Sequence, residues 1–153
     1  MIVSESELLD AVARDRAAGR TLALANGCFD LLHVGHVRYL HAAAAEADRL
    51  IVAVNDDRSV AGLKGDGRPI LPASDRAELV AAFRGVDYVV VFGDPNVERL
   101  LQLVKPDVHC KGTDYTIETV PEREIVKAYG GRTAIVGDPK DHSTSDLLSR
   151  LKK

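Results

Sequence analysis

The chain has no tryptophan, one methionine and only two cysteines among its 153 residues. Cys28 and Cys110 are too few for a disulfide framework or a four-thiolate zinc site, so we expect reduced thiols and a cytoplasmic location. No apolar run approaches the roughly 20 residues that a membrane-spanning helix needs. The net charge of -3 gives no indication of a nucleic-acid or membrane partner.

Two common phosphate-binding motifs are also missing. No GxGxxG follows the first expected strand, and no GxxxxGK[ST] occurs anywhere, which excludes the usual dinucleotide fingerprint and the P-loop. The chain is 46% hydrophobic and 28% charged, values that are ordinary for a globular protein. Its length favours a single domain over residues 1–153.

Apolar runs alternate with segments of helical periodicity. A first helix is expected over 4–18, where Ser4 and Glu7 fit a capping box. Short apolar runs predict five strands, at 21–25, 49–55, 86–92, 107–111 and 132–136. Helical spacing and capping residues predict helices at about 34–46, 74–84, 95–104 and 121–129, and a last one from 143 with Leu147, Leu148 and Leu151 facing inward. This alternation predicts an α/β fold, a Rossmann-like parallel five-stranded sheet with helices on both faces.

The turn between the first expected strand and the next helix, residues 26–36, holds two histidines. His33 and His36 lie three residues apart at the start of the helix and therefore share a face. Gly35 between them lets a ligand approach the backbone, and the helix N-terminus favours negative charge. The pattern predicts a site for a polyanion, most simply a nucleotide triphosphate. The competing interpretation is that one histidine caps the helix and the other is exposed.

Further candidates follow other strands and are expected at the same edge of the sheet. Segment 56–69 contains three glycines and a proline and predicts a mobile loop that carries Lys64. Gly112 and Asp114 follow the fourth strand, and Ser143, Thr144 and Ser145 precede the last helix. Simpler interpretations are a solvated Lys64, a plain helix cap at 143–145, and Cys28 and Cys110 as packed thiols rather than a metal or redox pair.

The sequence Asn26-Gly27-Cys28-Phe29-Asp30 running into His33-Val34-Gly35-His36 resembles the HxGH turn of the cytidylyltransferase-like nucleotidyltransferases. Ser143-Thr144-Ser145 is similar to the second motif of that family. Segments 54–57, 63–69, 86–89, 105–115 and 129–131 resemble the D-glycero-β-D-manno-heptose 1-phosphate adenylyltransferases, the ADP-heptose synthase group. The resemblance extends from about residue 21 to residue 151.

The resemblance implies transfer of AMP from ATP to a heptose 1-phosphate with release of pyrophosphate, and Mg²⁺ is expected to accompany the ATP. On this interpretation His33 and His36 donate to the phosphates, and Lys64 is a mobile cation for the α-phosphate or the sugar phosphate. Ser143, Thr144 and Ser145 hold the β- and γ-phosphates. These roles require positioning and charge neutralisation more than acid–base chemistry.

The resemblance assigns the remaining site residues as well. Cys28, Phe29 and Gly35 are expected under the nucleotide, and Gly112 and Asp114 beside the nucleoside. Asn26 and Asp30 are expected on the substrate side, where Asp30 orients a histidine or lies near the metal, whose ligands stay unassigned. A homodimer is expected, as is a separate upstream heptose kinase, because neither a sugar-kinase segment nor a second phosphate motif is recognised.

Two other functions stay open. Arg84 resembles an arginine of the glycerol-3-phosphate cytidylyltransferases, which makes that activity the alternative. A nucleotide-sensing module without turnover is the alternative of another class, and the pair His33 and His36 together with Lys64 argues against it. Some relatives have an arginine shortly before the serine-threonine motif, where this chain offers Lys140 or His142.

Overall fold

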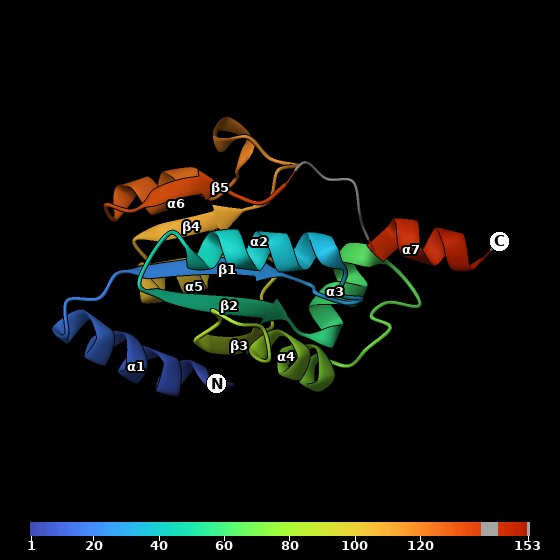
Figure 1. Cartoon of the computed structure of the whole chain (residues 1–153), viewed down its shortest axis with the longest axis horizontal. Coiled ribbons are helices and arrows are strands. Elements are labelled where there is room, and N and C mark those ends of the chain that lie inside the picture. The colour runs from blue at the N-terminus through green and yellow to red at the C-terminus, as the bar shows by residue number, and fades with distance from the viewer. Residues whose placement is uncertain (139–143, 153) are drawn as a thin grey trace.

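The computed structural model describes residues 1–138 and 144–152 and contains one sheet of five parallel strands. Their order across the sheet is β3-β2-β1-β4-β5 (Figure 1). The strands are β1 (Leu22–Gly27), β2 (Arg49–Asn55), β3 (Tyr88–Phe92), β4 (Val108–Lys111) and β5 (Arg132–Ile135). The Rossmann-like α/β fold expected from the sequence is confirmed.

The central strand β1 pairs with β2 on one side and with β4 on the other. From β1 the chain first builds outward through β2 and β3, and then crosses back to add β4 and β5. The direction of building therefore changes between β1 and β4. In open parallel sheets the crevice beyond the carboxyl ends of two such strands is the usual place for a ligand.

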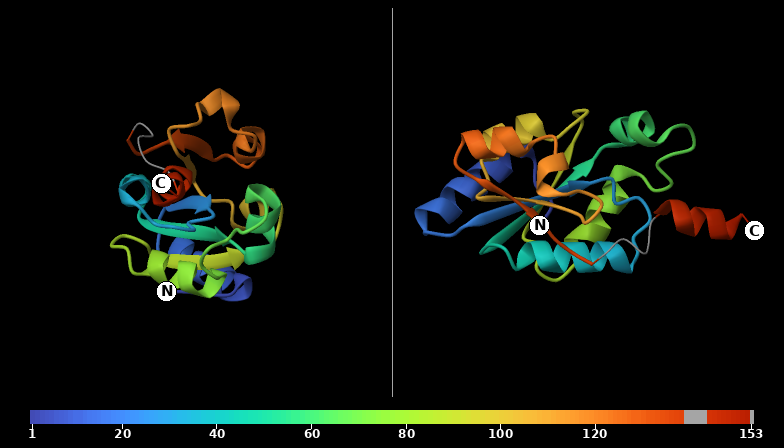
Figure 2. Two further views of the ribbon diagram at one scale, coloured as in Figure 1. Left: turned by 90° about the vertical axis from the view of Figure 1, so that its right-hand side faces the viewer. Right: turned by 90° about the horizontal axis from the view of Figure 1, so that it is seen from above.

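Helices cover both faces of the sheet (Figure 2). Buried side chains of α2 (Val34–Ala44) and α4 (Ala73–Ala81) pack with one set of alternate strand residues. Those of α1 (Glu5–Ala17), α5 (Glu98–Val104) and α6 (Arg123–Ala128) pack with the other set. Every residue of β2 after Arg49 is buried, as expected for a strand covered on both faces.

The capping box predicted for the first helix is present. The Ser4 hydroxyl accepts from the Glu7 amide at 3.1 Å, and the Ser4 amide donates to the Glu7 carboxylate at 2.9 Å. Two of the amides left without partners at the start of α1 are thereby satisfied.

The prediction of a mobile loop over 56–69 is wrong for its first half, because α3 (Asp57–Lys64) is a helix. Asp56 caps it by accepting from the Ser59 amide at 2.8 Å, and Val60 is fully buried beneath it. Gly65, at φ 93°, ends the helix. The cap and the buried valine outweigh the helix-weakening Gly62, which had favoured a loop assignment.

Several boundaries also differ from the prediction. α4 begins at Ala73 after Pro72 and ends at Ala81, where the sequence predicted 74–84. α5 begins at Glu98, later than Asp94 and Pro95 indicated. A short 3₁₀ helix, η1 (Ile117–Thr119), precedes α6. Helix ends are the positions that sequence patterns locate least well.

The last helix, α7 (Thr144–Leu151), extends away from the sheet in Figures 1 and 2. Leu147 and Leu148 are half-buried, but Leu151 is 79% exposed, so its predicted inward orientation is wrong. The spacing of apolar residues along the helix does not show which of them still reach the hydrophobic core. None of the helices within 1–138 and 144–152 has the length and apolar character needed to cross a membrane.

Candidate active site

A cavity of about 510 Å³ opens at the carboxyl ends of the central strands. Four stretches of chain line it, at 26–39, 63–68, 111–115 and 136–138, and Asn55 lies among them. The sequence had placed three of these stretches at one edge of the sheet, and the structure brings them together. Ser143 lies outside the described residues, as do Lys140 and His142; Thr144 and Ser145 begin α7, and their side chains are not described.

His33 and His36 are joined through the backbone at the start of α2. The Gly35 amide donates to Nδ1 of His33 at 3.1 Å, and the His33 amide donates to Nδ1 of His36 at 3.2 Å. A nitrogen that accepts a hydrogen bond carries no proton, so each neutral ring bears its hydrogen on Nε2. His33 therefore caps the helix, as the competing interpretation had it, and both rings still carry a donor.

The two imidazole rings lie against each other, with centroids 4.0 Å apart. Phe29 is 5.5 Å from His36 between ring centroids and is almost fully buried. Phe29 adopts a φ of 50°, which is unusual for a bulky residue, and a Cβ at Gly27 would meet its ring at 3.2 Å. Strained backbone at a strand-to-helix turn is typical of functional sites.

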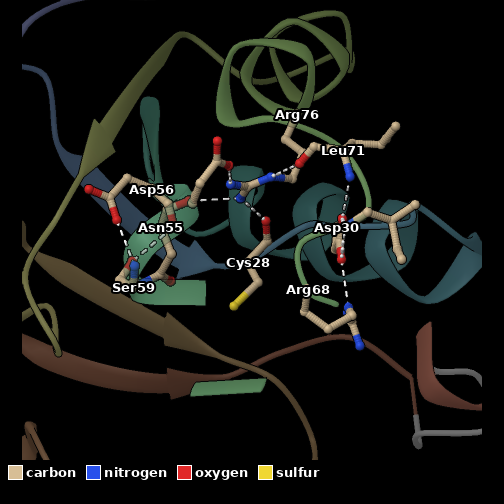
Figure 3. Close-up of polar contacts among 10 residues, drawn as sticks. Cys28, Asp30, Asn55, Asp56, Ser59, Arg68, Leu71 and Arg76 are labelled. Carbon is tan, nitrogen blue, oxygen red and sulfur yellow. Dashed lines mark hydrogen bonds and ion pairs between the residues drawn. The ribbon is translucent and has the colours of Figure 1, made fainter. Parts of the chain in front are cut away.

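Asp30 holds the segment that follows α3. Its buried carboxylate accepts from Arg68 Nε at 2.7 Å and from the amides of Ile70 and Leu71 at 2.9 and 3.0 Å (Figure 3). Burial alone would raise the pKa of Asp30, but the two amides and the Arg68 guanidinium outweigh it and lower the pKa. Through these contacts Asp30 holds Arg68 at the cavity. The predicted role of Asp30 in substrate binding stays a prediction.

Arg76 is fully buried below the cavity and joins four parts of the chain (Figure 3). Nη1 donates to the carbonyl oxygens of Cys28 at 2.6 Å and Asn55 at 2.7 Å. Nε donates to the carbonyl of Leu71, and Nη2 to the carboxylate of Asp57 at the start of α3. The guanidinium thus fixes the histidine turn relative to α3.

Lys64 is the last residue of α3, not part of a loop, and it lines the cavity with an exposed side chain. Burial raises the pKa of the Cys28 thiol, and the positive charges of Lys64, Arg76 and Arg68 act in the opposite direction. Cys28 therefore stays a neutral thiol near neutral pH. Its position beside Lys64 makes it part of the cavity wall rather than a nucleophile.

The far wall of the cavity follows β4 and β5. Lys111 Nζ lies 4.5 Å from the centre of the Tyr115 ring, and the Thr113 hydroxyl donates to the carbonyl of Asp138 at 2.6 Å. Gly112 and Asp114, expected beside the nucleoside, both line this wall. Lys111, Lys64 and the two histidines provide the cavity with positive charge and hydrogen-bond donors, and both suit a phosphate group.

Asn26 lines the cavity from the end of β1 and contacts a buried histidine. Its Oδ1 lies 2.9 Å from Nε2 of His109, which is fully buried in β4. Burial and the charge of Lys111 lower the pKa of His109 to about 3, so the ring is neutral. Since an amide oxygen only accepts, the His109 hydrogen is on Nε2.

Four residues that line or support the cavity were not singled out from the sequence: Arg68, Arg76, His109 and Lys111. Arg68 and Lys111 lay inside the segments that carry the resemblance, and their charge was the available signal. His109 lies inside the strand expected at 107–111, and Arg76 lies in a helix where arginine is usually exposed. Arg84, which had suggested the glycerol-phosphate alternative, is exposed and is not among the residues lining the cavity.

Within the part of the chain that the structure describes, no group of three or more His, Cys, Asp and Glu side chains could hold a metal ion. Cys28 and Cys110 are both free thiols, and Cys110 is buried whereas Cys28 is half-buried. Burial raises the pKa of Cys110 to about 12.

This strand order, with two histidines at the N-terminus of the helix after β1, defines a Rossmann-like α/β protein with a site suited to a phosphate-bearing ligand. A family model described as Cytidylyltransferase-like matches residues 24–149, and the chain belongs to this family. The resemblance drawn from the sequence is thereby confirmed.

Two relatives are each named Bifunctional protein HldE. The protein from Pseudomonas entomophila is 46% identical, and that from Alcanivorax borkumensis is 43% identical, each over 152 residues. Both alignments cover 99% of this chain and 32% of the relative, so the chain spans about a third of their length. A lipopolysaccharide core biosynthesis protein from Thermoplasma volcanium has a similar solved structure, with a TM-score of 0.68, 26% identity, and coverage of 80% of this chain and all of that one.

Proposed function

We propose that the chain is a sugar-phosphate nucleotidyltransferase that transfers AMP from ATP to D-glycero-β-D-manno-heptose 1-phosphate, giving ADP-heptose and pyrophosphate. The observation that carries the proposal is the pair His33 and His36, whose tautomers are set by backbone amides so that Nε2 carries the hydrogen. Relatives named HldE and a structural neighbour described as a lipopolysaccharide core biosynthesis protein support a role in surface-glycan precursor synthesis.

The proposed reaction forms a bond between the anomeric phosphate oxygen of the acceptor and the α-phosphorus of ATP. The bond to the pyrophosphate oxygen breaks, and no covalent enzyme intermediate is needed. Negative charge shifts to the bridging and equatorial oxygens in the transition state, and preorganised donors stabilise it there. His33 and His36 supply two such donors, and the α2 N-terminus favours negative charge at the same place.

Lys64 and Arg68 are the acceptor-side cations in this proposal. Both line the cavity, Lys64 from the last position of α3 and Arg68 from the segment between α3 and α4, where Asp30 holds it. Two phosphate groups must approach each other for the reaction, and their mutual repulsion opposes binding. Cations that contact both phosphates reduce this repulsion.

Mg²⁺ is proposed to enter with ATP. Because the described residues offer no cluster of carboxylates for it, and Asp30 is already bonded to Arg68 and two amides, the phosphate oxygens would be its principal ligands. The ion would neutralise charge on the departing pyrophosphate. The residues of this chain need only bind the complex and orient it.

The test is a product assay with purified protein. ATP or CTP is offered in turn with D-glycero-β-D-manno-heptose 1-phosphate, heptose 7-phosphate or glycerol 3-phosphate, and nucleotide-linked products are separated. ADP-heptose from the first acceptor alone supports the proposal. CDP-glycerol as the main product would contradict it in favour of a glycerol-3-phosphate cytidylyltransferase, and binding of ATP without any pyrophosphate release would indicate a nucleotide sensor.

A further inference from the structure

We propose that Asn26 and Asn55 form a subsite for a hydroxyl group of the sugar acceptor, and that buried His109 is the positioning residue that orients the Asn26 amide. This inference rests on the proposed function, because it names the part of the acceptor that one side of the cavity would contact. It adds to the phosphate contacts a pair of neutral groups that distinguish one sugar phosphate from another.

The sheet places both asparagines on one face. Asn26 pairs in register with Ala53, and Asn55 is two residues further along the same strand, so their side chains point the same way. Ala53 packs in the cluster that includes α1 and α5, whereas α2 packs in the cluster on the other face. The asparagines therefore line the cavity from the side of the sheet opposite to the helix that carries the histidines.

His109 contacts the oxygen end of the Asn26 amide, so the nitrogen end is the one on the cavity side. Leu24 and His109 are partners in register, so His109 shares the face of Leu24 and Asn26 and lies directly beneath the Asn26 side chain. Its Nε2 hydrogen is donated to Oδ1, which leaves the two Nδ2 hydrogens of Asn26 as donors on the cavity side. Among the described residues none accepts from that nitrogen.

The tautomer that makes this arrangement leaves Nδ1 of His109 buried without a partner among the described residues. A buried polar atom without a hydrogen-bond partner lowers the stability of the fold, and native structures hold few of them. The neighbouring strand residue Thr133 also has a buried hydroxyl without a described partner. An apolar side chain would fill this place more favourably, so the imidazole is explained by its contact with Asn26.

Asn55 presents the complementary group. Its Nδ2 donates to the Ser59 hydroxyl at 3.2 Å, and its backbone carbonyl is held by Arg76. With Nδ2 engaged, Oδ1 is the acceptor that remains, and no described residue donates to it. A hydroxyl group donates one hydrogen and accepts others, so a donor on β1 and an acceptor on β2 fit a sugar hydroxyl.

The experiment measures steady-state kinetics with ATP and D-glycero-β-D-manno-heptose 1-phosphate. In His109→Phe, and in the double variant Asn26→Leu/His109→Phe, we expect the KM for the acceptor to rise about tenfold or more, as a lost hydrogen bond to a substrate hydroxyl predicts. The KM for ATP should change less than about twofold. His109→Gln, whose amide nitrogen reaches the position of Nε2, should restore most of the acceptor affinity.

Thr133→Val is the matched control, since it changes the partner of His109 in β5 without touching Asn26, and it should leave both KM values unchanged. The double variant replaces both polar partners by apolar groups and is expected to keep the fold even where a single change does not. A series of monodeoxy heptose 1-phosphates completes the test. The acceptor that lacks the contacted hydroxyl should have the same KM with the wild type and with the double variant, because neither protein can bind a group that is absent.

Three results would overturn the inference. An unchanged KM for the acceptor in the double variant excludes the subsite. If the double variant raises the KM of every deoxy acceptor by the same factor relative to the wild type, contact with one particular hydroxyl is excluded. Both leave the proposed function intact, because wild-type turnover is measured in the same assay. Absence of nucleotide-linked product from the wild type with every sugar phosphate removes the proposed function and the subsite together.

Discussion

Nη1 of Arg76 donates to the backbone carbonyl of Cys28 at 2.6 Å, which connects α4 to the histidine turn 48 residues earlier in the sequence. The same guanidinium holds the carbonyls of Asn55 and Leu71 and the carboxylate of Asp57. Since the catalytic candidates lie on separate segments, a buried multivalent donor is what keeps them at fixed relative positions. Arg76 is therefore a positioning residue, and it contacts no cavity-lining side chain that we expect to bind phosphate.

Arg76→Met is expected to destabilise the protein by about 3–5 kcal/mol, because three buried carbonyl oxygens lose their donor. Chemical denaturation measures the change in the free energy of unfolding. Arg84→Met is the matched control, since Arg84 is exposed just after the same helix and should alter stability by less than about 0.5 kcal/mol. Equal losses in the two variants would show that the Arg76 contacts contribute little.

His33→Ala and His36→Ala should each lower kcat/KM by roughly 10²–10³, the usual effect of removing one preorganised donor. Because His33 also caps α2, His33→Asn is a sharper variant: asparagine keeps the cap and removes the imidazole. We expect it to retain stability and lose activity. His41→Ala, on the exposed face of the same helix, is the control for the kinetics. Near-normal turnover of either histidine variant would refute the assignment.

Lys64→Ala should lower kcat more than it weakens ATP binding, because the ammonium group contacts phosphates most strongly as charge develops during transfer. Pre-steady-state and steady-state kinetics separate the two effects. Lys127→Ala removes an exposed lysine of α6 and should change neither. If only the KM for ATP rose, Lys64 would be a ground-state binder, and its proposed part in the transition state would be wrong.

The buried His109 ring should make the free energy of unfolding depend on pH. Burial lowers its pKa to about 3, whereas in the unfolded chain a histidine titrates near 6.5, so between these values the unfolded state binds the extra proton. Folding stability supplied by the neutral ring is then complete above about pH 6.5 and declines as the pH falls, by at most about 1.4 kcal/mol per pH unit.

Urea denaturation at pH 7 and pH 5 measures this decline in the wild type and in His109→Gln, which lacks the titrating group. The other histidines are common to both proteins, so the difference isolates His109. We expect the wild type to lose more stability than the variant over this interval. Parallel losses would mean that His109 is protonated as readily in the folded state as in the unfolded chain, contrary to its buried contact with Asn26.

The sequence alone determined the order of the strands and helices along the chain and the presence of two histidines at the start of the helix after the first strand. Near-continuous apolar runs such as 49–55 are typical of strands covered on both faces, and their alternation with helices favours parallel pairing. The pair His33 and His36 is local, since one helical turn brings the residues together whatever the rest of the chain does. The same local character made the Ser4 capping box predictable.

Only the tertiary structure decided which segments far apart in the sequence contact one another. Whether 57–64 is a loop or a helix depended on burial of Val60 against the body of the protein, which overrides the glycine content of that segment. The roles of Asp30, Arg76 and His109 depend on partners 38 to 83 residues away in sequence, at Arg68, Cys28 and Asn26. A buried hydrogen bond forms only where folding brings two particular groups together. The periodicity of the sequence does not predict which distant groups become such partners.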